Sequence, residues 1–231
     1  MDHRTEIYVV GPSSTGKTTL CNALAKRLGL TGQQFVTEVA RDVIKALGLG
    51  RKDIGLLEMQ KAIMLAHLEH DREGTTRLCD RSAIDPIVYA IFTATSPVDA
   101  QTRKQALISL PEFQAALPRY RNSMFILLTP VKEWLVDDGF RHVGDEMDIL
   151  AIFRDILTDL GIQHREIGSE MRSLSERTEY VLSLATDIQS QDIDFPDGTH
   201  RNLDRRTKLK FFRSDSVGGC ASGGMCRPLV S

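Results

Sequence analysis

The chain has 231 residues, of which 42% are hydrophobic and 26% are charged, and this balance is typical of a single globular domain with one core. The formal net charge is −2, with both signs mixed along the chain. That distribution argues against nucleic acid and anionic membranes as partners, because both require a concentrated basic surface.

From its apolar pattern we expect neither a secretory signal nor a membrane span in this sequence. The first apolar run spans only Ile7–Val10, which is far shorter than the core of a secretory signal, and no stretch approaches the length of a membrane span. The four cysteines, Cys21, Cys79, Cys220 and Cys226, lack the spacing of a zinc site. We interpret them as thiols in a reducing compartment and expect a cytoplasmic protein.

Strand and helix signals alternate along the chain. Ile7–Val10 is a short β-branched and aromatic run, and apolar residues recur at helical spacing across Lys17–Leu28. Further strands are predicted at Phe35–Val36, Leu78–Cys79, Met124–Leu128 and Gln163–Ile167. Further helices are predicted at Val39–Leu47, Ile54–Glu69, Pro86–Thr95, Asp99–Leu110, Glu146–Leu160 and Glu170–Ile188. Strands separated by helices indicate a three-layer α/β fold, in which a parallel sheet of about five strands is flanked by helices.

The alternation ends near residue 191. The predicted domain spans residues 1–190, and residues 191–231 form a tail that is rich in Gly and Ser toward its end. The tail is predicted to be disordered because it lacks apolar periodicity. Its basic run, Arg201–Lys210, is interpreted as a solvated segment, and a role in binding a partner is the alternative.

Residues 11–18, with the sequence Gly-Pro-Ser-Ser-Thr-Gly-Lys-Thr, match the phosphate-loop pattern G-x-x-x-x-G-K-[ST]. The match lies between a predicted strand and a predicted helix, where a glycine-rich turn directs backbone N–H groups and the helix dipole at phosphate oxygens. Lys17 would contact the β- and γ-phosphates, and the Thr18 hydroxyl would join the shell of a Mg²⁺ ion. The predicted nucleotide-binding residues are Gly11, Ser13, Ser14, Thr15, Gly16, Lys17, Thr18 and Thr19. The sequence therefore predicts binding of a nucleoside triphosphate with Mg²⁺.

A second polar segment follows the strand predicted at Leu78–Cys79. Asp80 lies at the carboxyl end of that strand, where parallel sheets bind their ligands, and is a candidate Mg²⁺ ligand. Arg81 would meet an anionic or hydroxyl-bearing ligand, or the transferred phosphoryl group, through its forked donors. Asp85 precedes a proline, so it is either a substrate contact or the N-cap of the next helix. The N-cap interpretation is preferred.

Glu38 and Arg41 lie three residues apart where the second predicted strand passes into a helix, so they would share one helical face near the sheet edge. A carboxylate at this place could accept the proton of an attacking hydroxyl, which makes Glu38 a candidate catalytic base and both residues candidate substrate contacts. The alternative is a first-turn Glu that favours the helix dipole beside an ordinary surface Arg.

The segment Trp134–His142 follows the fourth predicted strand and contains an Asp-Asp-Gly turn, a lone Trp and a basic end. These features suggest a segment that moves rather than a core element. As a lid it would bring Arg141 over the triphosphate to stabilise charge on the transferred group. A plain surface turn is the alternative.

The motifs GPSSTGKTTL, TEVARDVI, LCDRSAIDPIVYA and EWLVDDGFR occur in an order and spacing that resemble the P-loop family of AAA-type domains that includes the NadR-type ribosylnicotinamide kinases. The resemblance covers roughly residues 5–185. It implies a P-loop NTPase fold similar to nucleoside and nucleotide monophosphate kinases, with a lid over the nucleotide. It also implies that Lys17 and Thr18 contact triphosphate and Mg²⁺, that Glu38 lies near the acceptor hydroxyl, and that Arg141 belongs to the lid.

Two functions from different classes follow. The first is an ATP–Mg²⁺-dependent phosphotransferase, with Lys17, Glu38, Asp80 and Arg141 as catalytic residues. Its acceptor is a hydroxyl or a phosphate of a small molecule, with a ribonucleoside such as nicotinamide riboside as a candidate. The second is a nucleotide-dependent switch that presents ordered loops to a protein partner, with a plain hydrolase as a lesser possibility. GTP is disfavoured because no N/T-K-x-D segment follows the fourth strand. An acceptor pocket beside the phosphate loop would favour the kinase.

Overall fold

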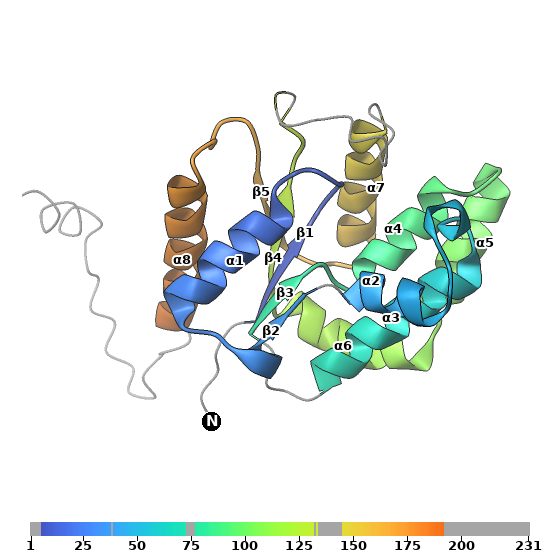
Figure 1. The fold of residues 1–231 in the computed structure, drawn as a ribbon, viewed down its shortest axis with the longest axis horizontal. Helices are drawn as coiled ribbons and strands as arrows, with labels where there is room; N and C mark the ends of the chain where they lie inside the picture. Colours follow the sequence, from blue (N-terminus) through green and yellow to red (C-terminus); the bar gives the residue numbers. More distant parts are fainter. Residues whose placement is uncertain (1–5, 38, 73–76, 132, 134–144, 192–231) are drawn as a thin grey trace, which may run out of the picture. The chain divides into compact units, whose positions relative to one another are not determined.

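The computed structural model describes residues 6–37, 39–72, 77–131, 133 and 145–191. The strands are β1 (Ile7–Val10), β2 (Phe35–Val36), β3 (Leu78–Asp80), β4 (Met124–Leu128) and β5 (His164–Ile167). The α-helices are α1 (Lys17–Leu28), α2 (Val39–Ala46), α3 (Leu57–Arg72), α4 (Ile84–Phe92), α5 (Pro97–Ile108), α6 (Pro111–Arg121), α7 (Glu146–Asp159) and α8 (Leu174–Gln191). Two short 3-10 helices lie at Gly32–Gln34 and Arg51–Asp53. Figure 1 shows these helices arranged on both sides of a central sheet.

The strands form one parallel sheet in the order β2-β3-β1-β4-β5. The central strand is β1, in which Ile7 is in register with Leu78 of β3 on one side and with Met124 of β4 on the other. Because the strands are parallel, the loops that follow β1 and β3 leave from the same edge of the sheet. The predicted α/β fold with about five parallel strands is confirmed.

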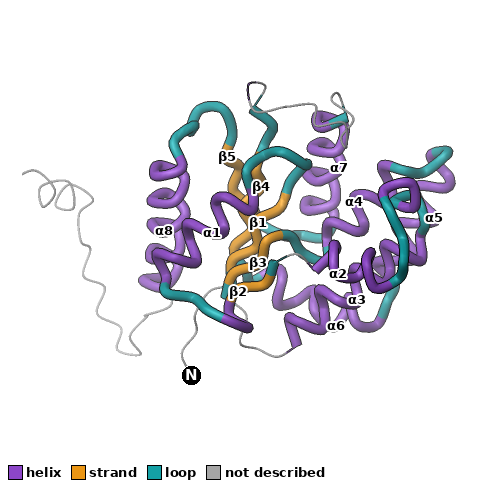
Figure 2. The backbone as a smooth tube through the Cα atoms, viewed as in Figure 1, coloured by secondary structure: helices purple, strands orange, loops and turns teal. Residues whose placement is uncertain are grey.

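Alternate residues of β1 enter two separate cores, because successive side chains of a strand point to opposite faces. Tyr8 and Val10 belong to a core with residues of α3, α4, α6 and α7, whereas Ile7 and Val9 belong to a core with residues of α1 and α8. Figure 2 shows the sheet between these two helical layers. Every β1 residue is at most 3% exposed, and fully burying one such apolar side chain contributes about 1.5–3 kcal/mol.

The ends of the predicted elements shift by a few residues. The largest shift is at α8, which is predicted from Glu170 and begins at Leu174. Helix α6 is not among the predicted helices, and it contains prolines at its first turn and near its end. Pro111 occupies a first-turn position, where a missing N–H has no cost. Pro118 removes one intrahelical hydrogen bond, and burial of apolar residues on one face, with Phe113 fully buried, offsets that loss.

Cys21 on α1 and Cys79 on β3 are buried free thiols. Burial raises the pKa of both. In the parts of the chain that the structure describes, His, Cys, Asp and Glu side chains form no group of three or more that could hold a metal ion. Cys220, Cys226 and the rest of the predicted tail lie outside the described residues. Among the described helices, none combines the length and apolarity that a membrane span requires.

A polar cluster is buried near the amino end of β1. The Asp71 carboxylate on α3 is 2% exposed and accepts hydrogen bonds from the Tyr8 hydroxyl at 3.1 Å and the Tyr120 hydroxyl at 2.6 Å. Arg119 Nη2 lies 3.3 Å from Asp71 Oδ2. Burial raises the pKa of Asp71, although the Tyr120 hydrogen bond and the Arg119 charge oppose the shift. The cluster therefore ties β1, α3 and α6 together through one desolvated carboxylate.

We expect Tyr120→Phe to destabilise the fold, because it removes a short hydrogen bond to a buried charged group. Such a bond contributes about 1.5–3 kcal/mol, and each kcal/mol corresponds to about 2–4 °C in Tm for a chain of this size. Calorimetry measures the shift. The matched control is Tyr89→Phe, since the half-buried Tyr89 hydroxyl has only a 3.4 Å contact with Ser13 Oγ. Equal losses of Tm in the two variants would contradict the role assigned to Asp71.

Candidate functional site

The phosphate loop connects β1 to α1 at the carboxyl edge of the sheet. Gly11 has φ 134° and packs so closely that an added Cβ would collide with the carbonyl oxygen of Leu128, the last residue of β4. Gly16 has φ 88° and immediately precedes Lys17, the first residue of α1. Both positions therefore require glycine: Gly11 for lack of space as well as for its backbone angle, and Gly16 for its left-handed conformation.

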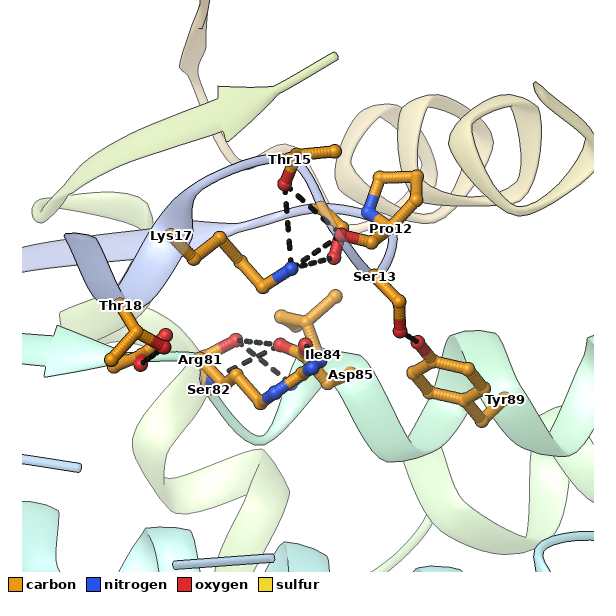
Figure 3. A network of polar contacts seen from close by, with 12 residues as sticks. Pro12, Ser13, Thr15, Lys17, Thr18, Arg81, Ser82, Ile84, Asp85 and Tyr89 are labelled. Atoms are coloured by element: carbon orange, nitrogen blue, oxygen red, sulfur yellow. Dashed lines mark hydrogen bonds and ion pairs between the residues drawn. The ribbon is translucent and has the colours of Figure 1, made fainter. Parts of the chain in front are cut away.

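Lys17 is bent back onto its own loop. Its Nζ donates to Gly11 O at 2.8 Å and to Pro12 O, and Pro12 O also accepts from Thr15 Oγ1 at 3.0 Å. Figure 3 shows Lys17 and Thr15 converging on Pro12 in this way. Burial, with a further contribution from the Arg81 charge, lowers the pKa of Lys17 to about 7. The ammonium group thus lies in a desolvated place where an anionic ligand would stabilise its charge.

Thr18 and Asp80 lie together, although they come from different elements. Thr18 Oγ1, on α1, donates to Asp80 Oδ2, at the end of β3, at 2.5 Å. The other carboxylate oxygen, Asp80 Oδ1, is buried without a hydrogen-bond partner among the described residues. An orphaned carboxylate oxygen beside a hydroxyl is a suitable pair of hard ligands for Mg²⁺. The residues present therefore fit the predicted metal.

Arg81, which directly follows β3, forms an ion pair with Asp85 in the first turn of α4, and Figure 3 shows this pair facing the phosphate loop. Arg81 has φ 82°, an uncommon angle for a residue other than glycine, and its Nη1 donates to Asp85 Oδ1 at 2.9 Å. Asp85 Oδ2 accepts from the Ser82 backbone N–H at 3.0 Å. Burial raises the pKa of Asp85, against the opposing charges of Arg81 and Lys17.

The preferred N-cap interpretation of Asp85 is wrong. The helix begins at Ile84 rather than Pro86, and the N-cap position is occupied by Ala83, which offers no side-chain cap. Asp85 lies within the first turn instead. Its carboxylate accepts hydrogen bonds from two residues that precede it in the chain, Arg81 and Ser82. Hydrogen bonds to a charged donor are strong, so this pairing stabilises a carboxylate that is only 3% exposed.

Several of the predicted site residues line one pocket of about 240 Å³. Its polar lining from the predicted site consists of Ser13, Thr18, Arg41, Asp80, Arg81 and Asp85. Its apolar lining consists of Val39, Ala40, Ile44, Ile54, Met59, Ile63 and Pro86, and Tyr89 adds a ring whose hydroxyl lies 3.4 Å from Ser13 Oγ. The pocket is therefore bounded by the phosphate loop on one side and by α2, α3 and α4 on the other.

Two pocket residues on α3, Gln60 and His67, are not among the residues predicted from the sequence. They share a face of the helix with Ile63, at positions i, i+3 and i+7, and are 2% and 3% exposed. His67 Nε2 is buried with no hydrogen-bond partner in the described part of the chain. Burial, assisted by the Arg81 charge, lowers the pKa of His67 to about 3, so the imidazole is neutral. Polar residues at inward positions of an apolar helical stripe are the signal that could have found them.

The remaining predicted residues are placed as follows. Ser14 has φ 62° and is half-buried in the loop, and Thr19 is exposed on the first turn of α1. Arg41 is exposed on α2 and contributes to the pocket rim. Glu38 and the whole segment Trp134–His142, which includes Arg141, lie outside the described residues.

Solved structures with the same fold include NadR and a deoxyadenosine kinase. NadR in complex with NR has 20% identity and a TM-score of 0.61, and the match covers 86% of this chain and 55% of that chain. NadR in complex with NAD and AMP-PNP has 16% identity and a TM-score of 0.58, covering 86% and 52%. The deoxyadenosine kinase of M. mycoides with bound dATP has 12% identity and a TM-score of 0.55, covering 79% and 99%. The chain thus spans about half the length of the NadR chains.

Sequence comparison supplies the family. No curated protein matches the chain, but the family model AAA_28, described as an AAA domain, matches residues 6–177. That range contains the phosphate loop, the whole sheet and every predicted site residue. The chain therefore belongs to this AAA-domain family, with the P-loop fold that nucleoside kinases share.

Proposed function

We propose that this protein transfers the γ-phosphoryl group of ATP to a hydroxyl group of a small molecule. Ribonucleosides, nicotinamide riboside among them, are the first candidate acceptors. The observation that carries the proposal is the pocket in which Ser13 and Thr18 of the phosphate loop meet residues of α2, α3 and α4. A cavity beside the phosphate loop is what transfer requires, because acceptor and donor must be held together.

The phosphate side of the proposal rests on Lys17 and the loop backbone. A triphosphate would offer oxygens in place of the Gly11 and Pro12 carbonyls that Lys17 now contacts. The start of α1 adds the positive end of its dipole. Charge spreads onto the transferred group in phosphoryl transfer, so a buried cation positioned here stabilises the transition state.

Thr18 and Asp80 would hold Mg²⁺, and the ion would supply positive charge that stabilises the charge of the phosphates. One carboxylate oxygen of Asp80 is available to bind the ion, since Oδ1 is buried without a partner among the described residues. The same carboxylate is oriented by the Thr18 hydroxyl at 2.5 Å.

The acceptor would occupy the part of the pocket that α3 and α4 line. Apolar residues such as Ile63 and Pro86 suit a flat or apolar body, and Gln60 and His67 offer hydrogen bonds to its polar groups. A neutral imidazole can donate or accept one hydrogen bond, whereas it attracts a phosphate or carboxylate less than a cation would. The pocket therefore favours an acceptor that presents an uncharged polar group to His67.

Glu38 as the base and Arg141 as a lid residue remain proposals, because both lie outside the described residues. Glu38 directly precedes α2, whose residues Val39 and Arg41 line the pocket. This placement in the chain supports the proposed proton transfer from the acceptor hydroxyl. The nucleotide-dependent switch is the weaker reading, since a switch needs no acceptor pocket beside the γ-phosphate.

The direct test is transfer of labelled γ-phosphate from ATP–Mg²⁺ to a panel of ribonucleosides and nucleoside monophosphates, nicotinamide riboside included, with an acceptor-free control. We expect an acceptor-dependent product from at least one member of the panel. Tight ATP binding without transfer to any acceptor would favour the switch and contradict the kinase.

A second prediction concerns His67. Replacing it with Leu keeps the volume and removes both ring nitrogens, so the KM for the acceptor should rise about tenfold, the loss of one buried hydrogen bond. The KM for ATP should not change. The control is His70→Leu, since His70 is an exposed residue of the same helix. A rise in the acceptor KM that is equal in both variants would remove His67 from the acceptor site.

A third prediction follows from Lys17. In the free protein its pKa is about 7, and a bound triphosphate raises that value, so binding above pH 7 takes up a proton. ATP affinity should therefore be greatest below pH 7 and fall above it, by at most about tenfold per pH unit. Calorimetry in buffers of different ionisation enthalpy measures the uptake. Lys17→Met should abolish the proton uptake that comes from Lys17. The proton exchange of ATP itself is the same for the wild type and the variant. Identical pH profiles would show that Lys17 does not meet the phosphates.

A further inference from the structure

Arg177 is a buried cation that none of the motifs accounts for. It lies in the first turn of α8, is 2% exposed and is the largest fully buried side chain in the described residues. All three of its donor nitrogens reach backbone carbonyls: Nε donates to Met171 O at 2.7 Å, Nη2 to Gly168 O at 3.0 Å and Nη1 to Thr15 O at 3.2 Å. The last of these carbonyls belongs to the phosphate loop.

The Thr15 contact determines where the next N–H group points. A peptide bond is planar, and the described peptides are trans, so the Thr15 carbonyl and the Gly16 N–H point in opposite directions within one rigid plane. Arg177 approaches from α8, which packs with α1 on one face of the sheet, whereas the pocket is lined by helices of the other face. Holding the Thr15 carbonyl toward α8 therefore turns the Gly16 N–H away from α8, toward the phosphate side of the loop.

Gly168, whose carbonyl accepts from Arg177 Nη2, is also held in place. Gly168 follows β5 and packs so tightly that an added Cβ would collide with Thr129 Oγ1, and the Thr129 N–H donates to Ile167 O at 2.9 Å. The Gly168 N–H donates to Glu170 Oε1 at 2.6 Å. Arg177 thus connects the loop to a segment braced against the end of β4, the strand that also contacts Gly11.

We propose that Arg177 is a positioning residue for nucleotide binding: its guanidinium holds the Thr15 carbonyl so that the Gly16 N–H is directed at the phosphates. The inference rests on the proposed binding of ATP by the loop. A forked guanidinium suits this task, because three separate carbonyls require three donors fixed in one plane. A lysine supplies charge and donors at a single point and reaches at most part of this set.

The test compares Arg177→Met, Arg177→Lys and Val181→Ala in the full chain. Val181 lies one turn further along α8 and is fully buried, so its truncation destabilises the same helix without touching the loop. Dissociation constants are measured for ATP–Mg²⁺ and for tripolyphosphate, which reports on the phosphate site alone, and Tm is measured for each variant. Where an acceptor is available, its KM is measured beside that of ATP.

We expect Arg177→Met to weaken both ATP and tripolyphosphate by about tenfold or more, the effect of misdirecting one hydrogen bond to a charged group. Arg177→Lys should recover part of this loss. Val181→Ala should lower Tm and leave both affinities within about twofold, and the acceptor KM should be unchanged in all three.

Three results would overturn the inference. The first is a folded Arg177→Met that binds ATP as the wild type does. The second is an equal loss of affinity in Val181→Ala, which would make the effect one of stability. The third is unfolding of both Arg177 variants while Val181→Ala stays folded, which would assign Arg177 to folding alone. Failure of the wild type to bind ATP or tripolyphosphate would instead overturn the proposed function together with this inference.

Discussion

Removing charged groups from water has a large free-energy cost, and this constraint governs the arrangement of the site. Lys17, Asp80 and Asp85 are each at most 6% exposed, and buried charges persist only with well-placed partners. Each of them is met by hydrogen bonds from the same edge of the sheet. Hydrogen bonds to these buried charged groups therefore hold the residues around the phosphate loop in place. A bound ligand would replace some of those hydrogen-bond partners.

The sheet supports that edge because its strands β1 and β4 are buried at every position. The run Met124–Leu128 is buried at every position, as expected for a parallel strand covered on both faces. Continuous apolar runs and the phosphate-loop pattern are local signals, so the fold class, the strands and the loop position could be predicted from the sequence. Pro111–Arg121 could not, because its helix depends on burial against distant elements, which overrides two prolines.

The site was harder to predict than the fold, because its residues converge only in three dimensions. Asp80 follows a recognisable strand, and its position was foreseeable. Gln60 and His67 are polar residues in an otherwise ordinary helical pattern, and only the placement of α3 beside the loop gives them a role. Arg177 is separated from its loop partner Thr15 by most of the chain. Long-range hydrogen bonds to backbone carbonyls leave no signature in residue spacing, so no motif could have found it.

The phosphate loop occurs early in the chain, but the groups that hold it occur late. Gly11 packs against Leu128, Thr15 is held by Arg177, and β1 is paired on both sides by strands that follow it in sequence. Contacts of such wide sequence separation form slowly, and a growing polypeptide leaves the ribosome from its amino end. The ordered loop must therefore be a late product of synthesis. A nascent chain that ends before α8 carries the complete phosphate-loop sequence, yet lacks the contacts that give this sequence its shape.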